Sequence, residues 1–203
     1  EFAYGLDAVR NDVIQDTAQE GSSLGGDFWA SDAPDSPTAA AVERAIKIVQ
    51  ERYAVYDIAT EAGIIDSPSW DAIEERVGSG NADREDAMNT GGVVTGLQNF
   101  DLSTYVDAEA RYIRDSYIAN DDNPGMTPND AQIQSYYDAH EWTISDDGAP
   151  AALEDVRSNV IQEYKQTYFE REVERRIQAQ DVHTDLAELR SFASEYLSAR
   201  GEK

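Results

Sequence analysis

Apolar residues recur at spacings of three and four along most of the chain, and this spacing is typical of amphipathic helices. The longest clear stripe predicts a helix that Ser36 caps, Pro37 opens and Gly63 ends. Two short β-prone runs, Val93-Val94 and Trp142–Ile144, are too short to pair into a sheet alone. The helical segments are expected at about 6–20, 37–62, 68–77, 103–117, 128–137, 151–180 and 185–198.

The pattern therefore predicts an all-α fold of about six to seven helices, with the N- and C-terminal helices packed together. Ser67 followed by Pro68 is expected to start the third helix, which Gly78-Ser-Gly80 weakens. Thr127-Pro-Asn-Asp130 has the form of a capping box and is expected to start the fifth.

The chain of 203 residues is long enough for one core or for two small lobes. We expect a single helical domain over 1–203, or two lobes at 1–120 and 127–203. The polar stretch 121–126 would bridge them. Glycine-rich breaks at 21–26 and 91–96 are expected to interrupt the helices.

Charge changes the picture most, because 16 basic residues face 41 acidic ones and the net charge is −25. Such a surface repels phosphate backbones and anionic membranes, so nucleic-acid binding is not expected. Two explanations stay open: the charge serves solubility or reflects a salty habitat, or it attracts basic partners. The segment 121–150 is the most one-sided, with no Lys or Arg. No apolar run is long enough to span a bilayer, and the opening Glu-Phe-Ala-Tyr-Gly suggests a trimmed mature fragment.

Catalytic and metal motifs are missing from the sequence. There is no cysteine, and the two histidines, His140 and His183, lie in no recognised nucleophile motif. No phosphate-binding glycine loop occurs. Asp121–Gly125 superficially resembles a calcium loop, but its glycine is one place early and the terminal glutamate is missing, while Asp146-Asp-Gly148 is expected to be a turn. We therefore expect no catalytic residue, no metal and no cofactor.

Aromatic residues are the remaining candidates for a binding site. Those on helical stripes either pack in the core with a tethered hydroxyl or face a ligand, and those in predicted loops either staple helices together or are exposed for binding. The candidate peptide-binding residues are Phe28, Trp29, Tyr53, Tyr56, Tyr112, Tyr136, Tyr137 and Trp142.

Three segments resemble parts of one protein family, and they occur in the same order along the chain. Thr127–His140, with its Tyr-Tyr pair, resembles a helix of the SurA/PrsA-type extracytoplasmic foldases. The stretch from Leu153 to Val182 is similar to that family's long closing helix, and Asp27-Phe-Trp29 through Pro37 to Gly63 is similar to its upstream portion. The resemblance covers about 25–182. It implies a fold like the SurA N-terminal helical domain.

One departure matters for function. The family often carries a parvulin prolyl-isomerase domain between the Tyr-Tyr helix and the closing helix, and here only Glu141–Pro150 lies there. The resemblance thus implies non-catalytic binding of unfolded or extended polypeptides, basic ones included, outside the cytoplasm. It also implies a secreted or lipid-anchored protein. A cell-surface adaptor for one folded partner and a regulatory member of an isomerase system are the alternatives, and the oligomeric state stays open.

Overall fold

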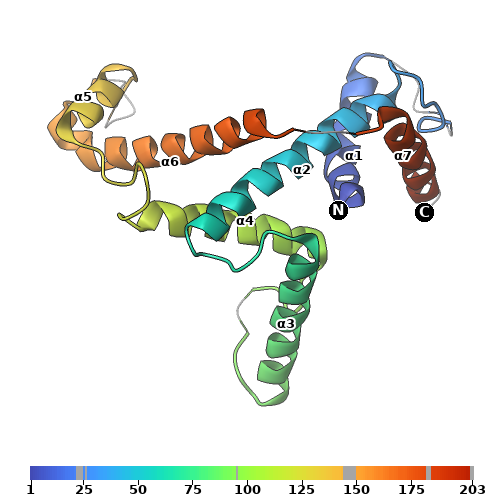
Figure 1. Cartoon of the computed structure of the whole chain (residues 1–203), viewed down its shortest axis with the longest axis horizontal. Coiled ribbons are helices and arrows are strands. Elements are labelled where there is room, and N and C mark those ends of the chain that lie inside the picture. The colour runs from blue at the N-terminus through green and yellow to red at the C-terminus, as the bar shows by residue number, and fades with distance from the viewer. Residues whose placement is uncertain (22–24, 26, 95, 144–149, 182–183, 202–203) are drawn as a thin grey trace. The chain divides into compact units, whose positions relative to one another are not determined.

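The computed structural model describes the whole chain except residues 22–24, 26, 95, 144–149, 182–183 and 202–203. Its described residues form seven helices and no strand, so the predicted all-α fold is confirmed (Figure 1). The one extended contact among them is an isolated antiparallel bridge between Thr143 and Pro150. The helices are α1 (Phe2–Gln19), α2 (Pro37–Glu61), α3 (Trp70–Asn89), α4 (Leu102–Ala119), α5 (Asp130–Asp138), α6 (Leu153–Ala179) and α7 (Leu186–Gly201).

Both ends of α2 follow the signals in the sequence. The Ser36 hydroxyl accepts a hydrogen bond from the amide of Ala39 at 3.1 Å, which satisfies one of the free donors of the first turn. At the other end Gly63 has a φ of +67°. The amide of Ile64 reaches back to the carbonyl of Ala59 at 2.8 Å. This bond closes a Schellman motif and ends the helix.

Two other helix starts differ from the prediction. Ser69 caps α3 by accepting from the amide of Ala72, so the helix begins two residues later than Ser67-Pro68 suggested. Asn129, and not Thr127, caps α5, where Asn129 and Gln132 exchange side-chain and backbone hydrogen bonds at 3.0 Å. With Thr127 as the cap, the third helical position would be Asp130. Its side chain is too short to reach back to the backbone of the capping residue as Gln or Glu does.

The residues pack into two compact units. The first comprises Glu1–Tyr53, Ser69–Asp107 and Ala179–Lys203, and the second comprises Ala54–Pro68 and Ala108–Gln178. Each unit therefore draws on both of the expected lobes, and the bridge 121–126 lies inside the second unit. The division into lobes at 1–120 and 127–203 stays a prediction about which parts of the chain fold independently.

The core of the first unit joins the two ends of the chain. Leu6, Val9 and Val13 of α1 are buried against small residues of α2. Ala193 and Leu197 of α7, both fully buried, complete the cluster. The predicted packing of the N- and C-terminal helices is confirmed in this unit. Tyr196 of α7 also donates a hydrogen bond to Asp7 of α1 at 2.9 Å.

In the second unit, α5 packs on the first half of α6. Its core cluster joins Ile133 and Tyr136 of α5 to Val156 and Val160 of α6. Further along α6, the ring of Phe169 lies 5.3 Å from that of Tyr117 on α4. A large apolar surface is thus removed from water in each unit, which is the main stabilising contribution to such folds.

Candidate functional site

A catalytic centre is not apparent in the part of the chain that the structure describes. His140 follows α5, where its Nδ1 lies 2.7 Å from the carbonyl of Tyr136 and its ring stacks on the Tyr136 ring at 4.2 Å. It faces no nucleophile in any described contact. His183 and the predicted turn at 146–148 lie outside the described residues. Among the residues that are described, no three carboxylate or imidazole groups are arranged to hold a metal ion, and no helix could cross a membrane.

The loop aromatics of the first unit lie between α1 and α2. The rings of Phe28 and Trp29 meet edge to face at 4.6 Å. Trp29 is buried in the core, and its carbonyl accepts a hydrogen bond from Thr38 at 2.9 Å. This geometry favours the packing alternative for Trp29. Phe28 is half-buried and lines a cavity of about 610 Å³.

Four carboxylates and one arginine are among the residues that line that cavity. Asp16 is paired with Arg44 at 2.7 Å, which leaves three further acids, Glu20, Asp27 and Asp35, beside one neutralised pair. The wall therefore carries negative charge next to the ring of Phe28.

The second unit gathers Tyr136, Tyr137 and Trp142 into one aromatic cluster. The rings of Tyr137 and Trp142 are nearly parallel, 11° apart. Trp142 donates its indole N–H to the carbonyl of Tyr137, and Tyr137 donates its hydroxyl to the carbonyl of Ala151 at 2.6 Å. The amide of Ala151 returns a bond to Trp142 at 2.8 Å. The Tyr137 hydroxyl and the Trp142 indole N–H thus both bind backbone carbonyls, and these bonds hold together the two ends of the connection between α5 and α6.

The same cluster borders a cavity of about 480 Å³. Tyr136 is buried, while Tyr137 and Trp142 are half-buried and line this cavity together with Asp138 and Glu141. The three candidates thus lie together, with two of them accessible at the cavity.

The other three candidate tyrosines lie apart from these clusters. Tyr56 is fully buried and donates a 2.7 Å hydrogen bond to the buried carboxylate of Glu109. Tyr112 is 61% exposed. Tyr53 is 38% exposed, and its hydroxyl donates to Glu1 at 3.0 Å. Partial burial and the Glu1 carboxylate raise the pKa of Tyr53 above its ordinary value. Of these three, Tyr112 offers the largest surface to a partner.

A charged clasp in the second unit connects the end of α2 to α6. Arg176 binds Glu61 through two guanidinium nitrogens and donates a third bond to Glu172 at 3.1 Å. The hydrogen bond from Arg176 lowers the pKa of Glu61. Bonds from Arg175 and then Arg176 lower the pKa of Glu172. Because each guanidinium already binds carboxylates, the clasp is a structural tie and does not supply a free cation.

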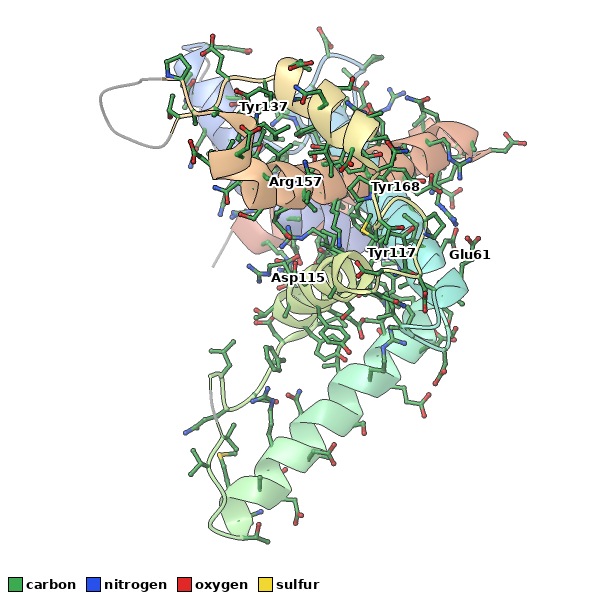
Figure 2. All side chains as sticks on the ribbon, turned by 90° about the vertical axis from the view of Figure 1, so that its left-hand side faces the viewer. Glu61, Asp115, Tyr117, Tyr137, Arg157 and Tyr168 are labelled. Atoms are coloured by element: carbon green, nitrogen blue, oxygen red, sulfur yellow. The ribbon has the colours of Figure 1, made fainter. Side chains whose placement is uncertain are left out.

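The clasp borders a small cavity of about 230 Å³. Figure 2 labels Glu61, Tyr117 and Tyr168, which α2, α4 and α6 contribute to its wall. Burial raises the pKa of Tyr117. Every titratable group with a shifted pKa here is explained by burial or by an ion pair.

The sequence pattern did not identify one apolar surface. Met88, Val93 and Leu97 follow one another around the end of α3, and Val93 is 90% exposed. The sequence predicts a glycine-rich break over 91–96, which is part of this stretch. The signal that could have identified it is the presence of Met88, Val93, Val94 and Leu97 beside and between the glycines, where a solvated loop normally has polar residues.

Comparison with known proteins shows similarity to a protein described as a chaperone. The chain is 32% identical over 143 residues to a protein of Bifidobacterium longum subsp. longum described as "Chaperone for lacto-N-biosidase". The match covers 70% of this chain and 51% of the relative, so the chain spans about half the length of the curated relative that it matches. No family profile matches the chain. No solved structure matches it either, and the likeness to the SurA fold stays an expectation from sequence.

Proposed function

We propose that this chain is a non-catalytic chaperone module that binds a client polypeptide in an unfolded or extended form. The similarity to a protein described as a chaperone, over 143 residues, is the observation that carries the proposal. It agrees with the independent resemblance of residues 25–182 to the helical region of extracytoplasmic foldases. The match covers 51% of the relative, so the activity of the whole relative is extended to this chain only as part of the proposal.

The surface has the two properties that a chaperone of this kind needs. Large apolar side chains are exposed in both units, including Leu97 at 52% in the first and Tyr112 at 61% in the second. A net charge of −25 keeps molecules apart while such groups are exposed. Apolar contact would supply most of the affinity for a client, and negative charge would speed encounter with basic ones.

The proposal also places the protein outside the cytoplasm. Its support is the family resemblance alone, since the members that share the Tyr-Tyr helix and the long closing helix act there. The chaperone function can be tested without settling the location.

A dedicated adaptor for one partner is the second candidate. The name of the relative specifies a single enzyme, lacto-N-biosidase, and this favours a narrow client range over a general one. A general chaperone would protect unrelated unfolded proteins, whereas a dedicated one would protect a single client.

The test is suppression of aggregation. Several unrelated proteins are unfolded in denaturant and diluted into buffer with increasing amounts of this chain, and light scattering is followed. An unrelated folded protein of similar negative charge serves as the control for non-specific electrostatic effects. We expect scattering to fall with this chain and not with the control. If no client is protected at stoichiometric excess, the general chaperone proposal is wrong and the adaptor function takes its place.

A further inference from the structure

The end of α3 and the segment that follows it form a closed arm. The described residues of this segment, 90–94 and 96–101, run back along α3 (Figure 2). Asn81 on α3 donates its side-chain amide to the carbonyl of Phe100 at 2.9 Å and accepts from the amide of Phe100 at 2.8 Å. One turn further, Arg84 donates to the carbonyl of Leu97 at 3.0 Å, and its guanidinium lies 4.6 Å from the centre of the Phe100 ring. These contacts hold the returning segment against the helix.

Beyond these contacts the arm has an apolar end, which we call the arm tip and define by Glu85, Met88, Val93 and Leu97. Val93 is 90% exposed, Leu97 is 52% exposed and Met88 is 39% exposed. Met88 lies one helical turn after Arg84 and hence on the face of α3 that carries the Leu97 contact. The three side chains are therefore grouped within a short stretch of chain.

Acidic side chains precede this apolar group on α3. Glu85 precedes Met88 by three positions, which places both on one strip of the helix surface. Asp83 and Asp86 are also exposed. The basic residue of this stretch, Arg84, is directed to Phe100 and Leu97. A partner that covers the arm tip thus meets apolar groups at the centre and negative charge at the edge.

We propose that the arm tip docks an extended client segment in which two or three large apolar residues are flanked by Lys or Arg. The inference rests on the proposed chaperone function and names the surface and the client chemistry for it. An extended segment fits because its alternate side chains can reach separate apolar groups while its flanking cations meet Glu85 and its neighbours. A second copy of this chain is disfavoured as the occupant, because two molecules of charge −25 repel each other.

Peptide binding tests the inference directly. A fluorescent synthetic peptide with a central Leu-Val-Phe-Leu flanked by lysines is titrated with the full chain, and anisotropy is measured. The same core flanked by glutamates is the comparison peptide. We expect tighter binding of the lysine-flanked peptide, and we expect added salt to reduce this preference more than it reduces binding itself.

Two kinds of variant assign the binding to the arm tip. The combined change Met88→Ser, Val93→Ser and Leu97→Ser alters only exposed side chains, so the melting temperature should hold. It should weaken peptide binding by about tenfold or more. Glu85→Lys should reduce the preference for the lysine-flanked peptide. The matched control is Glu75→Lys, the same change on the same helix about 15 Å away, and it should leave the preference nearly unchanged.

The outcomes separate the inference from the function on which it rests. If the triple variant and the wild type bind the peptide equally, the arm tip is not the docking surface and the chaperone proposal stands. If the wild type binds neither peptides nor aggregating clients, the chaperone proposal fails as well. Binding of the arm tip to anionic vesicles in place of peptide, or a wild-type dimer that the triple variant abolishes, would identify another occupant and overturn the inference.

Discussion

Substituting Gly125 by Ala should destabilise the second unit strongly, for two separable reasons. Gly125 has a φ of +81°, where an L-residue costs about 1–2 kcal/mol. A Cβ built there would also lie 2.5 Å from Cδ2 and Cε1 of Tyr168, because the ring of Tyr168 lies flat against this glycine. Moving a packed ring to admit a methyl group costs about 1–3 kcal/mol. We expect a total loss of about 3 kcal/mol.

Gly63→Ala is the matched control, because it carries only the backbone cost of placing an L-residue at a positive φ. Gly63 also belongs to the second unit and has a φ of +67°, but no atom lies within 4 Å of its would-be Cβ. Its loss should be about 1 kcal/mol, from the backbone alone. Urea denaturation followed by circular dichroism at 222 nm measures both variants, and the difference between them reports the contact with Tyr168.

A second substitution tests the cause. In the background Tyr168→Ala there is no ring to displace, so adding Gly125→Ala should cost only the backbone term, and the two changes should show a coupling of about 1–3 kcal/mol. Equal losses for Gly125→Ala and Gly63→Ala would refute the stacked geometry. So would a Gly125→Ala effect that is unchanged when Tyr168 is removed.

Four further outcomes are expected. Trp29→Ala should lower the free energy of unfolding by about 3–5 kcal/mol, because Trp29 is buried in the core of the first unit; an unchanged melt with weaker client binding would instead make it a contact residue. Tyr4 has a pKa raised by burial and then by Asp107, so its contribution to stability is complete below about pH 10 and is lost as pH rises through the raised value. Tyr4→Phe, which cannot ionise, should therefore show a flatter loss of stability between pH 9 and 11 in urea titrations. A coupled proline-peptide assay should detect no prolyl-isomerase activity, and activity that follows the chain through purification would contradict this. Chelator treatment should leave the thermal melt unchanged, whereas a saturable, calcium-specific shift would reveal a missed site.

Helices were predictable from the sequence because their signals are local. Ser36, Pro37 and Gly63 lie next to the helix that they delimit, and their hydrogen bonds are the ones that the residue types predict. The errors at the starts of α3 and α5 arose where two capping residues lie two positions apart. Ser67 competes with Ser69, and Thr127 competes with Asn129. The hydrogen bonds in the structure show that Ser69 and Asn129 are the capping residues.

The orientation of α4 shows where local pattern is insufficient. The apolar spacing of this helix runs through Tyr105, Ala108, Tyr112, Ile113 and Tyr117. The structure buries Ile113 and Tyr117 but exposes Tyr112, and it also buries Val106 and Glu109. Glu109 interrupts the apolar pattern of the buried stripe, where its carboxylate accepts a hydrogen bond from Tyr56 on another helix. Burial of Tyr56 and exposure of Tyr112 follow from that tertiary contact.

The reciprocal bonds between Asn81 and Phe100 have a consequence for how the chain can change. The side-chain amide of Asn81 donates one hydrogen bond to the backbone of Phe100 and accepts one from it, as a residue of a neighbouring strand would do. Together with the bond from Arg84 to the carbonyl of Leu97, this pair holds the returning segment in register. Lengthening a closed loop adds only about 0.6 kcal/mol for each doubling. Insertions of varied length between Asn89 and Leu97 should therefore leave the rest of the first unit intact, so the surface of the first unit can vary here without a new fold.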